Sequence, residues 1–139
     1  MKNKILLCGS KGRMGQAITN IAADHNCEIT VPIDQGDDPE SGILDCDVVI
    51  DFSLADATLK IARIAAATGK PMVIGTTGHD KSTKQKILNI LASNPVVWAG
   101  NFSSGVNLLF YLTQQASRVL DRDSGFDPEV MEMHHRLKK

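Results

Sequence analysis

The sequence is poor in aromatic residues and has no excess of charge of either sign. One Trp, one Tyr and four Phe are too few to form the aromatic platform on which nucleic-acid bases stack. The formal net charge is −1, so bulk electrostatic attraction to a nucleic acid or an acidic membrane is not expected. The composition therefore predicts neither a nucleic-acid partner nor a membrane partner.

Cysteines are also few, and no C-x-x-C pair occurs. Cys8, Cys27 and Cys46 lie far apart, each within or beside an apolar run. We therefore expect buried thiols, as is usual in a reducing cytoplasm, in place of a zinc site or a redox pair. His25 and His79 lack the spacing of metal ligands, so no metal cofactor is expected.

The chain has no long hydrophobic run. Its first apolar stretch extends only from Ile5 to Cys8, which is shorter than a signal-peptide core and far shorter than the roughly twenty residues of a membrane span. A hydrophobic content of 42% with 22% charged residues is typical of a globular protein. These features predict a cytoplasmic chain of 139 residues, long enough to bury a core.

What the sequence does contain is an alternation of short apolar runs with helical patterns. Strands are predicted at residues 4–9, 27–33, 46–52, 71–78 (with its following loop), 95–100 and 128–135. Helices are predicted at residues 13–25, 54–69, 80–93 and 104–121. This alternation predicts an α/β fold, a doubly wound parallel sheet with helices on both faces. In such folds ligands bind in the loops that follow the carboxyl ends of the strands.

The first of these loops reads GSKGRMG and contains Gly9, Gly12 and Gly15. It joins the first strand to the first helix, and Asp34 follows at the end of the second strand. Glycines at this place let the backbone approach a pyrophosphate at a helix N-terminus, and the acid can bind a ribose hydroxyl. The motif predicts dinucleotide binding, and a tight turn without a ligand is the alternative.

Asp34 also bears on the choice of cofactor, because Gln35 and not an arginine follows it. A free carboxylate accepts hydrogen bonds from the 2′-OH of NADH and repels the 2′-phosphate of NADPH. Lys11 and Arg13, in the glycine-rich loop, would partly offset that repulsion. The sequence favours NADH and leaves NADPH open, while a simple turn residue is the other reading of Asp34.

Three further loops are rich in small, hydroxyl-bearing and amide residues: DFS (51–53), GTTG (75–78) and GNFSSGVN (100–107). Each follows a predicted strand, so together they indicate a lined cleft, although each alone is also good capping chemistry. At the end of the chain, MHHRLKK places His134 and His135 on opposite sides of the predicted strand. Histidine can transfer a proton near neutral pH and Lys138 can donate from its ammonium, but a solvated basic tail is the alternative.

In this order, the segments GSKGRMG, VVIDFS, GTTG, AGNFSSGVN and MEMHHRLKK resemble those of the 4-hydroxy-tetrahydrodipicolinate reductase (dihydrodipicolinate reductase) family of bacterial lysine biosynthesis. The resemblance covers the whole chain, and its last two segments are specific to that family. It implies a Rossmann-like nucleotide-binding domain. It also implies reduction of a cyclic unsaturated imine dicarboxylate, formally dihydrodipicolinate, with NADH or NADPH as the cofactor.

The resemblance further implies roles for the matched residues. His134 would donate a proton, Lys138 would be the second catalytic residue, and His135 would contact the substrate. Hydride addition leaves a carbanion that a nearby acid must protonate, and a lysine offsets the charge of a dicarboxylate. The cofactor would contact Gly9, Ser10, Lys11, Gly12, Arg13, Met14, Asp34, Gly75, Thr76, Thr77, Ala99, Gly100, Asn101 and Phe102.

Members of this family continue into a second domain, which binds the substrate carboxylates and builds a homotetramer. Residues 1–127 are therefore expected to form the nucleotide-binding domain, and 128–139 to begin the catalytic hinge before the missing domain. A chain of this extent is expected to bind the cofactor and to reduce the substrate poorly. Two alternatives are a non-catalytic NAD(H)-binding module and a two-domain dehydrogenase of the aspartate-semialdehyde or homoserine type. The second is disfavoured because no cysteine follows a strand at the required loop.

Overall fold

A computed structural model of the chain describes residues 1–120, 123–127 and 129–133. The chain divides into two compact units, Met1–Gly100 and Asn101–Lys139. The division falls inside the range 1–127 that the sequence predicts as one domain, and that domain boundary stays a prediction.

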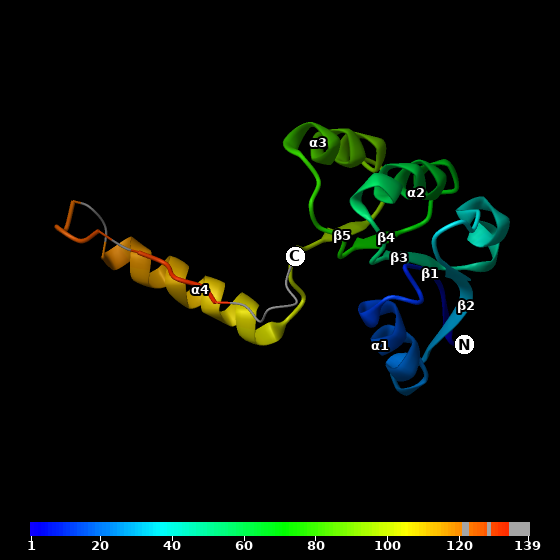
Figure 1. Ribbon diagram of the computed structural model, residues 1–139, viewed down its shortest axis with the longest axis horizontal. Helices are drawn as coiled ribbons and strands as arrows, with labels where there is room; N and C mark the ends of the chain where they lie inside the picture. The colour runs from blue at the N-terminus through cyan, green and yellow to red at the C-terminus, as the bar shows by residue number, and fades with distance from the viewer. Residues whose placement is uncertain (121–122, 128, 134–139) are drawn as a thin grey trace. The chain divides into compact units, whose positions relative to one another are not determined.

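The first unit is a parallel five-stranded sheet with strand order β2-β1-β3-β4-β5. Helix α1 lies on one face of the sheet, and α2 and α3 lie on the other (Figure 1). This arrangement confirms the predicted α/β fold, doubly wound with helices on both faces. In chain order the elements are β1 (Asn3–Cys8), α1 (Arg13–Ile21), the 3-10 helix η1 (Ala22–His25), β2 (Cys27–Ile33), the 3-10 helix η2 (Pro39–Asp45), β3 (Val48–Asp51), α2 (Ala55–Ala67), β4 (Met72–Ile74), α3 (Lys81–Ile90) and β5 (Val96–Trp98).

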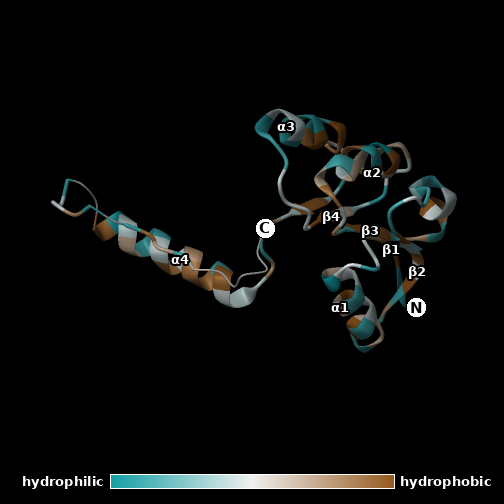
Figure 2. Cartoon of the chain, in the orientation of Figure 1, coloured by the Kyte–Doolittle hydropathy of each residue, from teal (hydrophilic) through white to brown (hydrophobic). Residues whose placement is uncertain are grey.

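The core of this unit is the apolar centre of the sheet, coloured brown along the strands in Figure 2. Leu6 and Leu7 on β1, Val49 on β3, and Met72 and Ile74 on β4 are at most 1% exposed. Neighbouring residues of a strand point to opposite faces, so their joint burial requires cover on both sides. Burial of each such side chain stabilises the fold by about 1.5–3 kcal/mol relative to leaving it exposed. The strands that carry these side chains therefore lie at the centre of the sheet.

The ends of the helices follow local capping chemistry. Asp80 caps α3, because its carboxylate accepts the backbone N–H of Thr83 at 2.7 Å. Helix α1 ends at Ile21, four residues before its predicted end. There the chain tightens into η1 and closes at Asn26, whose φ of 55° is left-handed.

The expectation of buried thiols is confirmed for two of the three cysteines. Cys8 on β1 and Cys46 after η2 are buried, whereas Cys27 at the start of β2 is half-buried. Burial raises the pKa of both the Cys8 and the Cys46 thiols, which keeps them protonated at neutral pH.

The second unit contains the helix α4 (Ser104–Val119), which begins where the sequence predicts. The hydroxyl of Ser103 caps it by accepting the backbone N–H of Val106 at 3.4 Å. The predicted strand at 128–135 is wrong over residues 129–133, which form no strand, while Pro128, His134 and His135 lie outside the described residues. Alternation assigns side chains to faces, but the hydrogen bonds of a strand must come from a neighbouring strand. Over the residues that the structure describes, no helix is long and apolar enough to cross a membrane.

Candidate functional site

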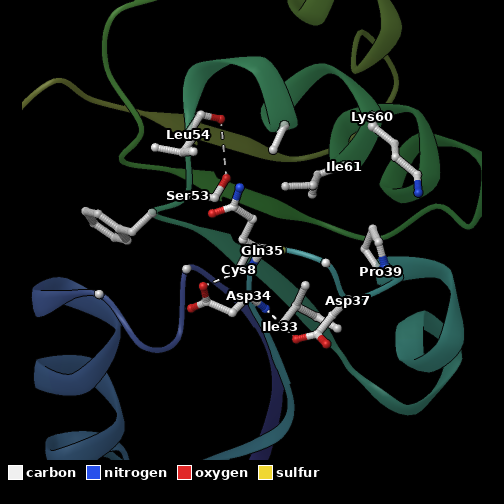
Figure 3. Close-up of a pocket in the computed structure, with 15 residues that line it drawn as sticks. Cys8, Ile33, Asp34, Gln35, Asp37, Pro39, Ser53, Leu54, Lys60 and Ile61 are labelled. Carbon is white, nitrogen blue, oxygen red and sulfur yellow. Dashed lines mark hydrogen bonds between the residues drawn. The ribbon is translucent and has the colours of Figure 1, made fainter.

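A pocket of about 400 Å³ opens at the carboxyl edge of the first unit's sheet (Figure 3). The chain passes from β1 to β2 on one side and then to β3 on the other side of β1. Such a reversal of strand order leaves a crevice outside the carboxyl ends of the two central strands, where α/β folds bind their ligands. The lining comes from the ends of β1, β2 and β3 with the loops that follow them, from the start of η2 and from α2: Cys8, Gly9, Gly12, Ile33, Asp34, Gln35, Gly36, Asp37, Pro39, Phe52, Ser53, Leu54, Ala57, Lys60 and Ile61.

The glycine-rich loop after β1 packs too closely against its surroundings for larger side chains. A Cβ on Gly9 would lie 2.4 Å from the carbonyl oxygen of Phe52, and the φ of Gly9 is +79°. A Cβ on Gly15 would lie 2.2 Å from the carbonyl oxygen of Gly9. The glycines therefore bring the loop, β3 and α1 into direct backbone contact.

The N-terminus of α1 has features that suit a phosphate group. Gly12 is its N-cap, no side chain caps it, and no acidic residue occupies its first turn. The first backbone N–H groups of a helix lack intrahelical partners and favour an anion. Gly12 lines the pocket, so these donors lie at its edge and fit the pyrophosphate of a dinucleotide.

Asp34 closes the pocket at the end of β2. Its Oδ2 accepts the backbone N–H of Lys11 at 2.8 Å, and its Oδ1 accepts the backbone N–H of Gln35 at 2.8 Å. These hydrogen bonds, that of Gln35 first, hold the pKa of Asp34 below its ordinary value. Each carboxylate oxygen keeps a lone pair, so the ionised group can still accept a hydrogen bond from a ribose hydroxyl.

Apolar side chains form much of the wall of the pocket. Ile33 and Pro39 come from β2 and η2, and Leu54, Ala57 and Ile61 come from the start of α2. A slot of this kind beside acidic groups, here Asp34 and Asp37, suits a planar heterocycle joined to a sugar. Figure 3 shows Asp34 on one side of the pocket, and Ser53, Leu54 and Ile61 on another.

Lys60 is a pocket residue that the sequence did not predict. It lies on α2, and its Nζ forms an ion pair with Asp38 Oδ1 at 3.2 Å at an exposed rim. No motif marks this lysine, because only the packing of α2 beside η2 brings it to the pocket. Phe52 and Ser53 do carry a signal, since they belong to the DFS loop that follows β3.

The loop after β4 carries Gly75, Thr76 and Thr77. Gly75 donates its N–H to the Asp51 carbonyl at 2.8 Å, and the Thr76 hydroxyl donates to the same oxygen at 3.2 Å. Thr76 is buried, and Thr77 is exposed and accessible to a ligand. A Cβ on Gly75 would lie 2.1 Å from the ring of Phe52, so this loop contacts the residue that lines the pocket from β3.

The structure places the remaining predicted residues in separate regions. Ser10, Lys11, Arg13 and Met14 lie in the glycine-rich loop and the first turn of α1, and Ala99 and Gly100 follow β5. Asn101 and Phe102 belong to the second unit, where Asn101 Oδ1 accepts the N–H of Ser103 at 2.8 Å just before α4. His134, His135 and Lys138 lie outside the described residues.

The strand order, the glycine-rich loop and the acid at the end of β2 together define a Rossmann-like nucleotide-binding domain. Residues 3–102 match the family model described as "Dihydrodipicolinate reductase, N-terminus", and the chain belongs to this family. Membership in a reductase family supports a pyridine nucleotide as the class of cofactor.

Curated relatives carry the same description. A 4-hydroxy-tetrahydrodipicolinate reductase of Akkermansia muciniphila is 46% identical over an alignment of 136 positions that covers 96% of this chain and 54% of that protein. One of Campylobacter jejuni is 40% identical over an alignment of 141 positions that covers 98% of this chain and 55% of that protein. The chain therefore spans about half the length of these relatives.

A solved structure shares the fold. It is a dihydrodipicolinate reductase from Paenisporosarcina sp. TG-14 with dipicolinate bound, and it matches with a TM-score of 0.72 at 21% identity. The match covers 84% of this chain and 54% of that chain.

Proposed function

We propose that this chain is the cofactor-binding part of a 4-hydroxy-tetrahydrodipicolinate reductase. The reaction is the NAD(P)H-dependent reduction of dihydrodipicolinate to tetrahydrodipicolinate in diaminopimelate and lysine biosynthesis. The observation that carries the proposal is the pocket at the reversal of strand order, where Gly9, Gly12 and Asp34 converge. The dicarboxylate substrate, the cytoplasmic location and the homotetrameric assembly implied by the family resemblance are parts of the same proposal.

In this proposal the adenosine half of the cofactor occupies the pocket. The N-terminus of α1 binds the pyrophosphate, and Asp34 accepts a hydrogen bond from the adenosine ribose. The adenine ring lies against the apolar wall that includes Ile33, Leu54 and Ile61. The predicted contacts at Gly75–Thr77 and Ala99–Phe102 serve the nicotinamide half.

The bound cofactor would supply the hydride. The chain's own residues would orient the cofactor, hold the substrate and deliver a proton. By resemblance to the family, His134 donates that proton, His135 contacts the substrate, and Lys138 offsets the charge of a substrate carboxylate. A proton donor beside the reacting ring is required, because hydride addition alone leaves negative charge on the product.

We propose NADH as the preferred cofactor. The lowered pKa of Asp34 keeps its carboxylate ionised at neutral pH, and that charge repels the 2′-phosphate of NADPH. The carboxylate accepts the backbone N–H of Lys11 and carries its negative charge at the pocket, where the charge of Lys11 also acts on it. The exposed side chains of Lys11 and Arg13 act in the opposite direction, towards NADPH.

The test is a calorimetric titration of the chain with NADH and then with NADPH at a fixed salt concentration. Saturable binding that is tighter for NADH supports both the cofactor site and the role of Asp34. Tighter binding of NADPH would show that Lys11 and Arg13 outweigh the carboxylate. If the folded chain binds neither nucleotide, the proposed cofactor site is wrong.

A further inference from the structure

Asp51, the last residue of β3, carries a fully buried carboxylate. The backbone N–H of Ser53 donates to its Oδ1 at 2.9 Å, and the hydroxyl of Ser53 donates to the same oxygen. The hydroxyl of Thr58, on α2, donates to Oδ2 at 2.7 Å. A carboxylate is costly to bury unless its oxygens are hydrogen-bonded, so the burial of Asp51 depends on the donors of Ser53 and Thr58.

The backbone of the same residue reaches a different loop. The carbonyl oxygen of Asp51 accepts the N–H of Gly75 at 2.8 Å and the hydroxyl of Thr76 at 3.2 Å. Asp51 therefore contacts both the loop at 52–54 and the loop that follows β4. These are two of the loops proposed above to surround the cofactor.

Phe52, the first residue of the loop at 52–54, lies between the glycine-rich loop and the loop that follows β4. Its N–H donates to the Cys8 carbonyl at 3.0 Å, and its own carbonyl oxygen would be 2.4 Å from a Cβ on Gly9. Its ring would be 2.1 Å from a Cβ on Gly75. Phe52 therefore occupies the space that a side chain at Gly9 or at Gly75 would need, so it fits closely between the glycine-rich loop and the 75–77 loop.

We propose that Asp51 is a positioning residue for the cofactor. Its Oδ1 accepts two hydrogen bonds from Ser53, which fix the direction of the chain immediately after Phe52. The position of Phe52 between Gly9 and Gly75 is fixed in this way. The Oδ2 of Asp51 serves a separate purpose, since the bond to Thr58 joins β3 to α2. The inference rests on the proposed function, because the positioned groups line the proposed cofactor pocket.

The two carboxylate oxygens have different partners, which allows a matched experiment. Asp51→Asn keeps the size of the side chain but leaves only one oxygen for the donors of Ser53 and Thr58. Ser53→Ala removes the hydroxyl that donates to Oδ1, and Thr58→Val removes the hydroxyl that donates to Oδ2. Thr58 does not line the pocket, so Thr58→Val serves as the control. For each variant we would measure the Kd for NADH by calorimetry, the Tm, and backbone hydrogen exchange of the ligand-free chain.

We expect Asp51→Asn to raise the Kd for NADH about tenfold, and we expect Ser53→Ala to raise it as well. Thr58→Val should lower the Tm yet leave the Kd within about twofold of the native value. The amide of Ser53 should exchange faster in Asp51→Asn than in the native chain, because one remaining oxygen must serve the donors of both Ser53 and Thr58. The amide of Phe52, which donates to the Cys8 carbonyl, should also exchange faster because the chain after it is held less firmly.

Two results would overturn the inference. The first is a folded Asp51→Asn or Ser53→Ala variant with the native Kd. The second is Thr58→Val raising the Kd as much as Asp51→Asn at an equal loss of Tm, because the effect would then be general destabilisation. Failure of the native chain to bind NADH would instead refute the proposed function. Native-like exchange at Phe52 and Ser53 in Asp51→Asn would contradict the inference even in that case.

Discussion

The imidazole of His79 meets the indole of Trp98 edge to face, with ring centroids 5.2 Å apart and ring planes at 85°. His79 follows the 75–78 loop after β4, and Trp98 is the last residue of β5, so the pair joins the carboxyl ends of two neighbouring strands. Edge-to-face aromatic pairs stabilise a fold beyond the area that they bury. Lys84 adds a cation on α3, with its Nζ 5.5 Å from the Trp98 ring centroid.

The pair predicts opposite effects for two substitutions of His79. Both imidazole nitrogens are buried and lack a hydrogen-bond partner among the described residues. Because an unpaired buried polar group is costly, His79→Phe should raise the free energy of unfolding by about 1 kcal/mol while keeping the aromatic contact. His79→Ala should lower it by about 1 kcal/mol. Urea unfolding can be followed by the fluorescence of Trp98, the single Trp of the chain. A His79→Phe variant less stable than the native chain would refute this explanation.

Asp34→Asn tests the cofactor preference. The change removes the negative charge that repels a 2′-phosphate while leaving an amide oxygen as an acceptor. The ratio of the Kd for NADPH to the Kd for NADH should fall about tenfold in calorimetric titrations. Asp56→Asn, on an exposed residue of α2 outside the pocket, makes the same change in net charge and serves as the control. An equal shift in both variants would show that net charge, and not the site, decides the preference.

Gly75→Ala tests the close approach of Phe52. An added Cβ would lie 2.1 Å from the Phe52 ring, so the ring or the loop must move. Overpacking of this kind should lower the free energy of unfolding by about 1–3 kcal/mol and weaken NADH binding. Gly105→Ala is the matched control, because its Cβ would meet its nearest atom at an ordinary 3.8 Å. Equal stability of Gly75→Ala and the native chain would show that Phe52 is free to move.

The N-cap of α3 predicts a pH dependence of stability. Hydrogen bonds from the Thr83 N–H first, and from the Ser82 and Thr83 hydroxyls, lower the pKa of Asp80 from 3.8 to about 2. Since the pKa is lower in the folded state, the ionised cap stabilises the fold above pH 3.8, and this contribution is lost as the pH falls towards about 2. The Tm of Asp80→Ala should therefore lie below the native Tm at neutral pH, with the two values converging near pH 2. Parallel curves of Tm against pH would contradict the assignment of the cap.

Much of the fold could be predicted because its signals are local. Apolar runs predict β1 and β3, and an aspartate followed by an amphipathic pattern predicts the cap and the body of α3. The strands and helices predicted from the sequence leave residues 34–45 unassigned, and the η2 helix forms there at Pro39–Asp45. Its burial depends on a distant residue, since a Cβ on Gly42 would lie 2.4 Å from the side chain of Val31 on β2.

The residues of the candidate site also include some that the sequence predicts and some that it does not. Gly9, Gly12 and Asp34 belong to a motif whose spacing reflects one turn and one strand, and the structure brings them to one pocket. Lys60 reaches the pocket only because α2 packs beside η2, and no pattern within α2 marks it.

By itself the sequence determined the alternation of strands and helices, the glycine-rich loop and the acid that follows β2. Each depends on residues close together in the chain, where periodicity, capping and the freedom of glycine act directly. Only the tertiary structure decided that Asp51 is buried and joins two loops. Its place follows from pairing with Cys8 across β1 and β3 and from the packing of Thr58 against it, contacts that depend on strand order and register. A residue in a DFS turn becomes a positioning residue only when parallel strands bring their carboxyl ends to one edge.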